Sequence, residues 1–334
     1  MAGEGEEANN LPSSSPWFRI SIVSFYGRYL RRCLSAAGLS QHTLQIDDDT
    51  TIHFWGPDPP FYDLDRDSDS DPDSANHKGK PPLILIHGFG PDALWQWRQQ
   101  ASYFARDFAL YIPNLVFFGN SRTKSSAPWS EIFQAEAIVK LAEKLGMNKY
   151  SVVGTSYGGF VAYRMASMWP ERVDKVVIAS SGVNMTKKDN EELVKRADVK
   201  KIEEVLLPAS PHQLRNLLSL ATFNFTGMSY LPDFFFNDLV HKLYAENRKE
   251  KMELLKGLAL GRQDTVHLSP LHQEVLIVWG EHDKIFLLEK ANQLKELLGE
   301  KTRLQIIENA AHVPQIERPG RFNKIVKNFL QGST

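Results

Sequence analysis

The stretch from Tyr150 to Tyr163 constrains the fold of this chain more than any other. It begins as an apolar, β-prone run, breaks at Gly154, and resumes after Gly158 as a run compatible with a helix, with Ser156 inside the break. A Gly-x-Ser-x-Gly pattern between a strand and a helix sets the serine on a sharp, strained turn with its hydroxyl above the sheet edge. The glycines are needed because a Cβ atom there would collide with the neighbouring strand and helix. The pattern predicts that Ser156 is a nucleophile; the alternative is a tight turn that contains serine by chance.

From residue 83 onward, short apolar runs alternate with helical stretches. Runs of this kind are typical of strands that are buried on both faces of a sheet. We expect strands over Leu83–Ile86, Ala109–Ile112, Tyr150–Val153, Lys175–Ala179, Val275–Val278 and Arg303–Ile307. The alternation predicts an α/β fold in which helices cover a mostly parallel sheet. The 334 residues are enough for one such domain with an insertion.

Residues 183–270 interrupt this alternation. They contain no pair of strand-like runs and consist largely of charged helical stretches. We interpret them as a helical cap inserted over the carboxyl edge of the sheet, where open α/β folds bind ligands. The predicted α/β core then comprises residues 41–182 and 271–334.

The first 40 residues differ from the rest of the chain. Residues 1–15 are small and polar, and we predict that they are disordered. Residues 16–39 interleave aromatic and aliphatic side chains with arginines such as Arg28, Arg31 and Arg32, which predicts a basic, aromatic amphipathic helix. Such a helix either packs on the domain or lies on a membrane surface, and packing is the more common arrangement.

The charge of the chain is nearly balanced, with 39 basic and 40 acidic residues and a formal net charge of −1. No general basic field exists to bind nucleic acid, so we exclude that class of partner. Cys33 is the only cysteine, which rules out an intramolecular disulfide and suits a reducing compartment. The N-terminus is acidic, unlike a secretory signal, and no apolar run approaches the length of a bilayer span. We therefore expect a cytoplasmic protein, with residues 16–39 as the one candidate for peripheral membrane contact.

A serine nucleophile needs a base to take its proton and a third group to orient that base. Among the 10 histidines, His312 is the candidate base because it follows the last predicted strand and precedes a final helical stretch. The acid should also follow a strand. After Val275–Val278 the chain reads Trp-Gly-Glu-His-Asp-Lys, and we favour Asp283 over Glu281 as the acid. Such an acid fixes the histidine tautomer and stabilises the imidazolium.

A developing oxyanion needs hydrogen-bond donors that are in place before the reaction. The backbone N–H of Tyr157, directly after the serine at the start of a helix, is one candidate. The backbone N–H of Phe89 is the other, in the His-Gly-Phe-Gly segment that follows Leu83–Ile86. We expect His87 to be structural support. No cluster with metal-ligand spacing lies near these motifs, so we expect no metal ion.

Together these motifs resemble those of the α/β-hydrolase fold family. The matching segments are His-Gly-Phe-Gly at 87–90, Gly-Thr-Ser-Tyr-Gly-Gly at 154–159, Gly-Glu-His-Asp-Lys at 280–284 and Ala-His-Val-Pro at 311–314. The order Ser, Asp, His along the chain is also the order of that family. The resemblance implies a water-using acyl hydrolase without a cofactor. Within the serine hydrolase branch, the chain is similar to plant hydrolases of the monoacylglycerol lipase and carboxylesterase type.

The resemblance leaves other activities open. Serine-dependent C–C bond hydrolases are similar too, although they commonly carry tryptophan after the histidine, where Val313 stands here. Epoxide hydrolases and haloalkane dehalogenases place an aspartate at the position of Ser156, which excludes both branches. Some members of the family act mainly as small-molecule receptors. A dinucleotide-binding oxidoreductase is the weakest alternative, because Pro91 and Asp92 fit a pyrophosphate site poorly.

The leading hypothesis is a serine hydrolase that cleaves a carboxylic ester with a lipophilic acyl group through an acyl-enzyme intermediate. The lipophilic part of this hypothesis depends on aromatic residues of the predicted cap. We expect some of these rings to line an acyl pocket, and the alternative is a small satellite core that holds the cap together. The rings are those of Phe223, Phe225, Phe234, Phe235 and Phe236.

Overall fold

The computed structural model describes residues 21–61, 79–126, 128–261 and 263–332. The tail predicted to be disordered, residues 1–15, and the first part of the helix predicted over residues 16–39 lie outside these ranges. In the described part of the chain, nine strands form one sheet. They are β1 (Ser40–Gln45), β2 (Thr50–Gly56), β3 (Pro82–Ile86), β4 (Ala109–Pro113), β5 (Arg122–Thr123), β6 (Tyr150–Thr155), β7 (Val173–Ala179), β8 (Glu274–Gly280) and β9 (Thr302–Ile307).

The sheet is antiparallel at one edge and parallel over the rest. The order of its strands is β1-β2-β4-β3-β6-β7-β8-β9, and the short β5 pairs with β2. β2 is antiparallel to both β1 and β4, whereas every neighbouring pair from β4 to β9 is parallel. All six strands predicted from the apolar runs are present, and the mostly parallel sheet is confirmed.

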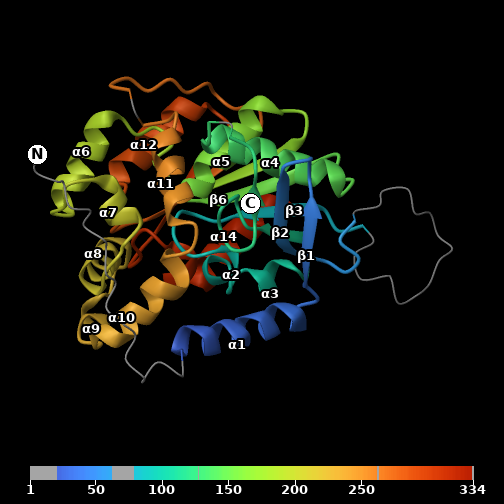
Figure 1. The fold of residues 1–334 in the computed structure, drawn as a ribbon. Coiled ribbons are helices and arrows are strands. Elements are labelled where there is room, and N and C mark those ends of the chain that lie inside the picture. The colour runs from blue at the N-terminus through green and yellow to red at the C-terminus, as the bar shows by residue number, and fades with distance from the viewer. Residues whose placement is uncertain (1–20, 62–78, 127, 262, 333–334) are drawn as a thin grey trace, which may run out of the picture.

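Helices cover both faces of this sheet (Figure 1). Those outside the insertion are α1 (Ile22–Ala36), α2 (Ala93–Gln96), α3 (Ala101–Phe104), α4 (Glu131–Lys144), α5 (Tyr157–Met168), α12 (Leu288–Leu298), α13 (Pro314–Glu317) and α14 (Pro319–Gln331). On β3, Ile84 and Ile86 belong to the hydrophobic core shared with α4, α5 and α12. Leu83 and Leu85 belong to the opposite core, shared with α1, α2, α3 and α14. This burial on both faces explains why the strands read as continuous apolar runs.

Residues 183–270, here called the helical insertion, connect β7 to β8 and contain no strand among their described residues. The helices are α6 (Lys187–Arg196), α7 (Ile202–Leu206), α8 (Pro211–Ala221), α9 (Thr226–Ser229), α10 (Asp233–Leu239), the π-helix Val240–Tyr244 and α11 (Arg248–Gly257). Figure 1 shows α6 to α10 stacked along the left side of the molecule, beside the sheet. Two small hydrophobic clusters hold this insertion together, one around Leu193 and Leu220 and the other around Phe236 and Tyr244.

The N-terminal helix α1 packs on the domain mainly through one face. Its buried residues are Val23, Gly27, Leu30 and Leu34, and it contacts α2, α3 and α10. In the ranges that the structure describes, no helix combines the length and apolar character needed to cross a bilayer.

Candidate active site

Ser156 stands at the junction of β6 and α5 on a strained turn. Its backbone lies at φ 51° and ψ −120°, a region that residues other than glycine rarely adopt. The flanking glycines make the turn sterically feasible. A Cβ atom on Gly154 would stand 2.1 Å from the carbonyl oxygen of Gly158, and one on Gly158 would stand 2.2 Å from that of Ile86. Ser156 remains partly exposed in this turn, and strain of this kind is concentrated at functional sites.

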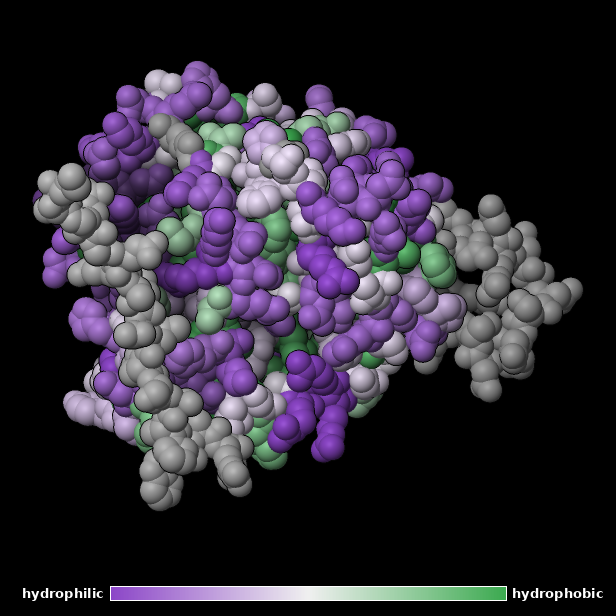
Figure 2. Space-filling model, in the orientation of Figure 1, coloured by the Kyte–Doolittle hydropathy of each residue, from purple (hydrophilic) through white to green (hydrophobic). Residues whose placement is uncertain are grey.

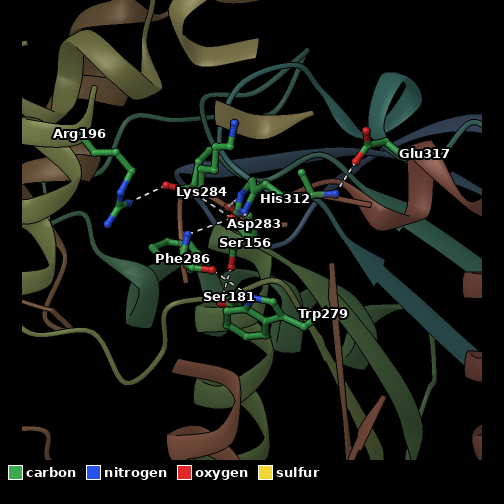
Figure 3. Close-up of polar contacts among 11 residues, drawn as sticks. Ser156, Ser181, Arg196, Trp279, Asp283, Lys284, Phe286, His312 and Glu317 are labelled. Carbon is green, nitrogen blue, oxygen red and sulfur yellow. Dashed lines mark hydrogen bonds and ion pairs between the residues drawn. The ribbon is translucent and has the colours of Figure 1, made fainter. Parts of the chain in front are cut away.

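Ser156, His312 and Asp283 form one hydrogen-bonded chain (Figure 3). His312 Nε2 lies 2.9 Å from Ser156 Oγ, and His312 Nδ1 lies 2.9 Å from Asp283 Oδ2. Because an ionised carboxylate can only accept, Nδ1 carries the imidazole proton and Nε2 is free to accept the serine proton. The three residues are distant in the sequence, but each follows a strand of the parallel part of the sheet, so they meet at its carboxyl edge.

The structure brings Asp283, and not Glu281, to the histidine. Asp283 is only 3% exposed, and its Oδ1 accepts hydrogen bonds from the backbone N–H groups of Ile285 and Phe286 at 2.8 and 3.0 Å. Glu281 is exposed, and its Oε2 lies 3.3 Å from the ring of the neighbouring histidine. Two backbone donors on one oxygen and the imidazole on the other therefore fix the orientation of the Asp283 carboxylate.

The loop after β3 lies directly against the serine. A Cβ atom on Gly88 would stand 2.9 Å from the Cβ atom of Ser156. Gln96 holds this loop, since its Oε1 accepts from the Gly88 N–H at 2.8 Å and its Nε2 donates to the Gly88 carbonyl at 2.9 Å. The ring of Phe89 packs edge-on against that of Tyr157, with 5.5 Å between the centroids. The two residues predicted to supply oxyanion donors thus lie side by side next to Ser156.

His87 is fully buried beneath this loop. Its Nδ1 donates to the carbonyl of Gly88 at 2.8 Å, and its Nε2 accepts from the backbone N–H of Leu115 at 3.0 Å. Burial lowers the pKa of His87 to about 4, because the imidazolium would lose its hydration. His87 is therefore neutral near pH 7 and links the loops that follow β3 and β4, in agreement with a supporting role.

Two further residues support the site, and no sequence motif identified them. Ser181 Oγ donates to the carbonyl of Ser156 at 2.6 Å. Glu317 accepts from the backbone N–H groups of Ala311 and Phe223, at 2.7 and 2.6 Å, and so connects the histidine loop to the helical insertion. The only sequence feature that could have indicated Ser181 is its position just after β7, the strand beside β6.

The helical insertion also contacts the acid and histidine loops directly (Figure 3). Arg196 on α6 donates to the carbonyl of Lys284 at 2.6 Å, next to Asp283. The backbone N–H of His312 donates to the carbonyl of Ala221 at the end of α8, at 3.1 Å. The position of the insertion and the geometry of the two loops are therefore coupled.

A cavity of about 380 Å³ opens beside Ser156. It lies between the core and helices α6, α7 and α11 of the insertion. Charged side chains on its solvent side include Lys187, Glu191 and Lys200. The remaining wall is largely aliphatic or aromatic and includes Phe89, Phe160, Leu193, Leu206, Leu258 and Phe286. An apolar cavity that ends at a polar reactive group is the usual form of a small-molecule site.

None of the five phenylalanines predicted to line an acyl pocket lines this cavity. Phe236 is fully buried in a cluster inside the insertion, and Phe235 packs against the same cluster. Phe234 is 54% exposed, Phe223 stacks on the ring of a histidine on the surface, and Phe225 is half-buried before α9. The expectation is therefore wrong for this cavity. The three phenylalanines of α10 lie elsewhere because that helix packs against α8 and α1. For Phe235 and Phe236 the alternative holds, because both rings belong to a small core inside the insertion.

The backbone of the loop after β3, which was considered for dinucleotide binding, is occupied by contacts within the protein. Besides holding Gly88, Gln96 Nε2 donates to the carbonyl of Pro91 at 2.6 Å. The carboxylate of Asp92 stands at the start of α2, where a pyrophosphate would need a free helix N-terminus. In the described ranges, no three His, Cys, Asp or Glu side chains are grouped as a metal site.

The parallel sheet, the strained serine turn and the Ser–His–Asp chain are the features of an α/β hydrolase. Residues 81–319 match the model of the alpha/beta hydrolase fold family, and the chain belongs to that family.

Similar proteins include hydrolases of two kinds. The chain is 25% identical to 2-hydroxymuconate semialdehyde hydrolase of Pseudomonas sp. (strain CF600), over 75% of this chain and 86% of the relative. It is 23% identical to the monoacylglycerol lipase ABHD6 of Homo sapiens, over 75% of each. Among solved structures, a bacterial membrane phospholipase A has a TM-score of 0.70 at 23% identity, over 93% of this chain and 91% of that one. This structural likeness concerns the fold.

Proposed function

We propose that this protein is a serine hydrolase that cleaves carboxylic esters through an acyl-enzyme intermediate. The observation that carries the proposal is the hydrogen-bonded chain from Ser156 through His312 to Asp283, opening on an apolar cavity. A serine hydroxyl becomes an effective nucleophile when an oriented base accepts its proton.

In the first half of the reaction, Ser156 Oγ attacks the carbonyl carbon of the ester while His312 Nε2 takes the hydroxyl proton. Asp283 keeps its charge and stabilises the imidazolium that forms. The backbone N–H groups of Phe89 and Tyr157 bind the oxyanion of the tetrahedral intermediate. His312 then protonates the leaving alcohol, which leaves the acyl group on Ser156. Water, deprotonated by His312, attacks this acyl-enzyme, and His312 returns the proton to Ser156 Oγ as the bond to the acyl group breaks and the acid leaves.

The cavity supports a lipophilic acyl group as the substrate class. Residues Leu193, Leu206 and Leu258 line it together with aromatic rings of the core. Burial of one methylene group in such a wall contributes about 0.8 kcal/mol. We therefore expect the specificity constant, kcat/KM, to rise as the acyl chain lengthens until the cavity is filled.

A panel of p-nitrophenyl esters of increasing acyl length tests this proposal. The variant Leu206→Trp fills part of the cavity and should lower kcat/KM for long acyl chains by about tenfold, with little effect on the acetate. Phe234→Ala, at an exposed position outside the cavity, serves as the matched control and should leave the profile unchanged. A profile that is flat in the wild type, or equal in both variants, contradicts a lipophilic acyl site.

A C–C bond hydrolase is the second candidate, because the chain resembles 2-hydroxymuconate semialdehyde hydrolase about as closely as it resembles the monoacylglycerol lipase. Turnover of 2-hydroxymuconate semialdehyde, with no turnover of esters, favours this candidate. Binding of small molecules without turnover of either class favours a receptor.

A further inference from the structure

Helix α1 carries a second apolar face that no described residue packs against fully. Successive residues of a helix are 100° apart, so positions i, i+3, i+4 and i+7 share one face. In α1 these positions hold Ile22, Phe25, Tyr26 and Tyr29, whose exposed fractions are 47, 64, 40 and 55%. The residues that pack on the domain, such as Val23 and Leu30, lie roughly a third of a turn away. The exposed set, called here the outer stripe, is therefore centred away from the packing face, and Tyr26, at its edge, also contacts the domain.

The outer stripe is bordered by positive charge. Arg28 and Arg32 are both exposed on one side of it, and the guanidinium of Arg28 lies 5.8 Å from the centre of the Phe25 ring. Residues Ile22–Ala36 contain no acidic side chain. Figure 2 shows strongly hydrophilic and hydrophobic side chains next to one another over α1, at the lower edge of the molecule. Aromatic side chains flanked by arginine are the composition of helices that lie in the headgroup region of a membrane.

α1 is firmly attached to the domain. Asp238 on α10 is 9% exposed, and its Oδ2 accepts from Ser21 Oγ at 2.9 Å and from the backbone N–H of Val23 at 3.0 Å. These bonds satisfy the N-terminus of α1 and connect the helix to the helical insertion. Tyr26 also packs against Trp95 of α2, with 5.6 Å between the ring centroids. The outer stripe is thus presented by a helix whose orientation is fixed.

We propose that the outer stripe of α1 docks on an anionic lipid surface. In this arrangement α1 lies parallel to the membrane, Phe25 and Tyr29 enter the boundary between headgroups and acyl chains, and Arg28 and Arg32 pair with anionic headgroups. This inference concerns a surface outside the cavity next to Ser156, so it does not depend on the proposed hydrolysis.

Vesicle sedimentation with the full chain tests the proposal. We expect binding to vesicles of phosphatidylcholine with about 30 mol % phosphatidylserine, and at least about tenfold weaker binding to phosphatidylcholine alone. The double variant Phe25→Ser/Tyr29→Ser and the double variant Arg28→Glu/Arg32→Glu should each weaken binding to the anionic vesicles by about tenfold or more. Circular dichroism and turnover of a short soluble ester should be unchanged in both, because these side chains touch neither the core nor the serine.

Matched controls separate docking from general hydrophobicity and charge. Met168→Ser removes an exposed apolar side chain on α5, and Lys188→Glu reverses an exposed charge on α6; neither should alter sedimentation. The proposal is overturned if the wild type does not bind the anionic vesicles, or if the α1 variants bind as well as the controls. It is equally overturned if sedimentation equilibrium reveals a dimer that the Phe25→Ser/Tyr29→Ser variant abolishes, because the outer stripe then binds a second copy of the chain.

Discussion

Lowering the pH from about 7 to about 5 should destabilise the fold through His87. Burial lowers the pKa of this histidine from 6.5 to about 4, so the folded state holds it neutral while the unfolded chain binds a proton. Between these two pKa values the unfolded state binds more protons, and stability therefore falls as the pH falls. The contribution is fully present above pH 6.5 and is lost progressively down to about pH 4.

The size of the effect follows from the same shift. A change of one pKa unit corresponds to 1.36 kcal/mol, which gives about 3 kcal/mol for the complete loss. At about pH 5 the expected loss is about 2 kcal/mol relative to about pH 7. Burial also lowers the pKa of His53, so protonation of His53 destabilises the fold in the same pH range. The experiment must therefore separate the contributions of the two histidines.

Urea unfolding of the wild type and of His87→Gln at both pH values makes this separation. The variant loses hydrogen bonds to the loop at either pH, but only the wild type has the His87 proton to gain. The difference in unfolding free energy between the two proteins should therefore shrink by about 2 kcal/mol at the lower pH. His272→Gln, at an exposed position, should track the wild type. If the difference between wild type and His87→Gln is the same at both pH values, the account of His87 as a neutral buried linker is refuted.

Two further pairs of substitutions test the geometry of the site. Asp283→Asn should lower kcat for ester hydrolysis by about 10³–10⁴-fold, because the amide cannot stabilise the imidazolium. Glu281→Gln should change kcat by less than about twofold. A larger loss of kcat in Glu281→Gln than in Asp283→Asn would contradict the assignment of Asp283 as the acid. Gly158→Ala should lower the free energy of unfolding by at least about 2 kcal/mol, because the new methyl group would lie 2.2 Å from a backbone oxygen. Gly227→Ala is the control and should leave stability unchanged, because no atom lies within 4 Å of the added methyl group. Urea unfolding midpoints compare the stabilities of the two glycine variants. Equal midpoints would show that the serine turn can relax around the added methyl group.

Much of the sheet and of the serine turn could be predicted because local sequence determines them. Gly154, Ser156 and Gly158 occupy alternate positions of one five-residue segment, and their steric requirements are local. The positions of Asp283 and His312 followed from topology, since parallel strands deliver the ends of distant segments to one edge. The choice between Asp283 and Glu281 rested on spacing alone, and the structure separates them by burial.

The walls of the cavity could not be predicted in the same way. Phe234 and Phe236 are two positions apart, but on a helix this is a rotation of 200°, so one ring faces solvent and the other is buried. Which face of each helix in the insertion turns toward Ser156 depends on contacts between helices that are distant in the sequence. The ties made by Arg196 and Glu317 are of this kind, because both join the insertion to loops of the core.

Covalent labelling is the most direct test of whether Ser156 is an activated nucleophile. The folded protein is treated with a fluorophosphonate, which reacts with an activated serine, and the modified residue is mapped by peptide mass spectrometry. We expect one adduct, on Ser156, which is absent in Ser156→Ala and forms far more slowly in His312→Ala. Labelling of another serine such as Ser181, or labelling of Ser156 at an unchanged rate without His312, would contradict this expectation.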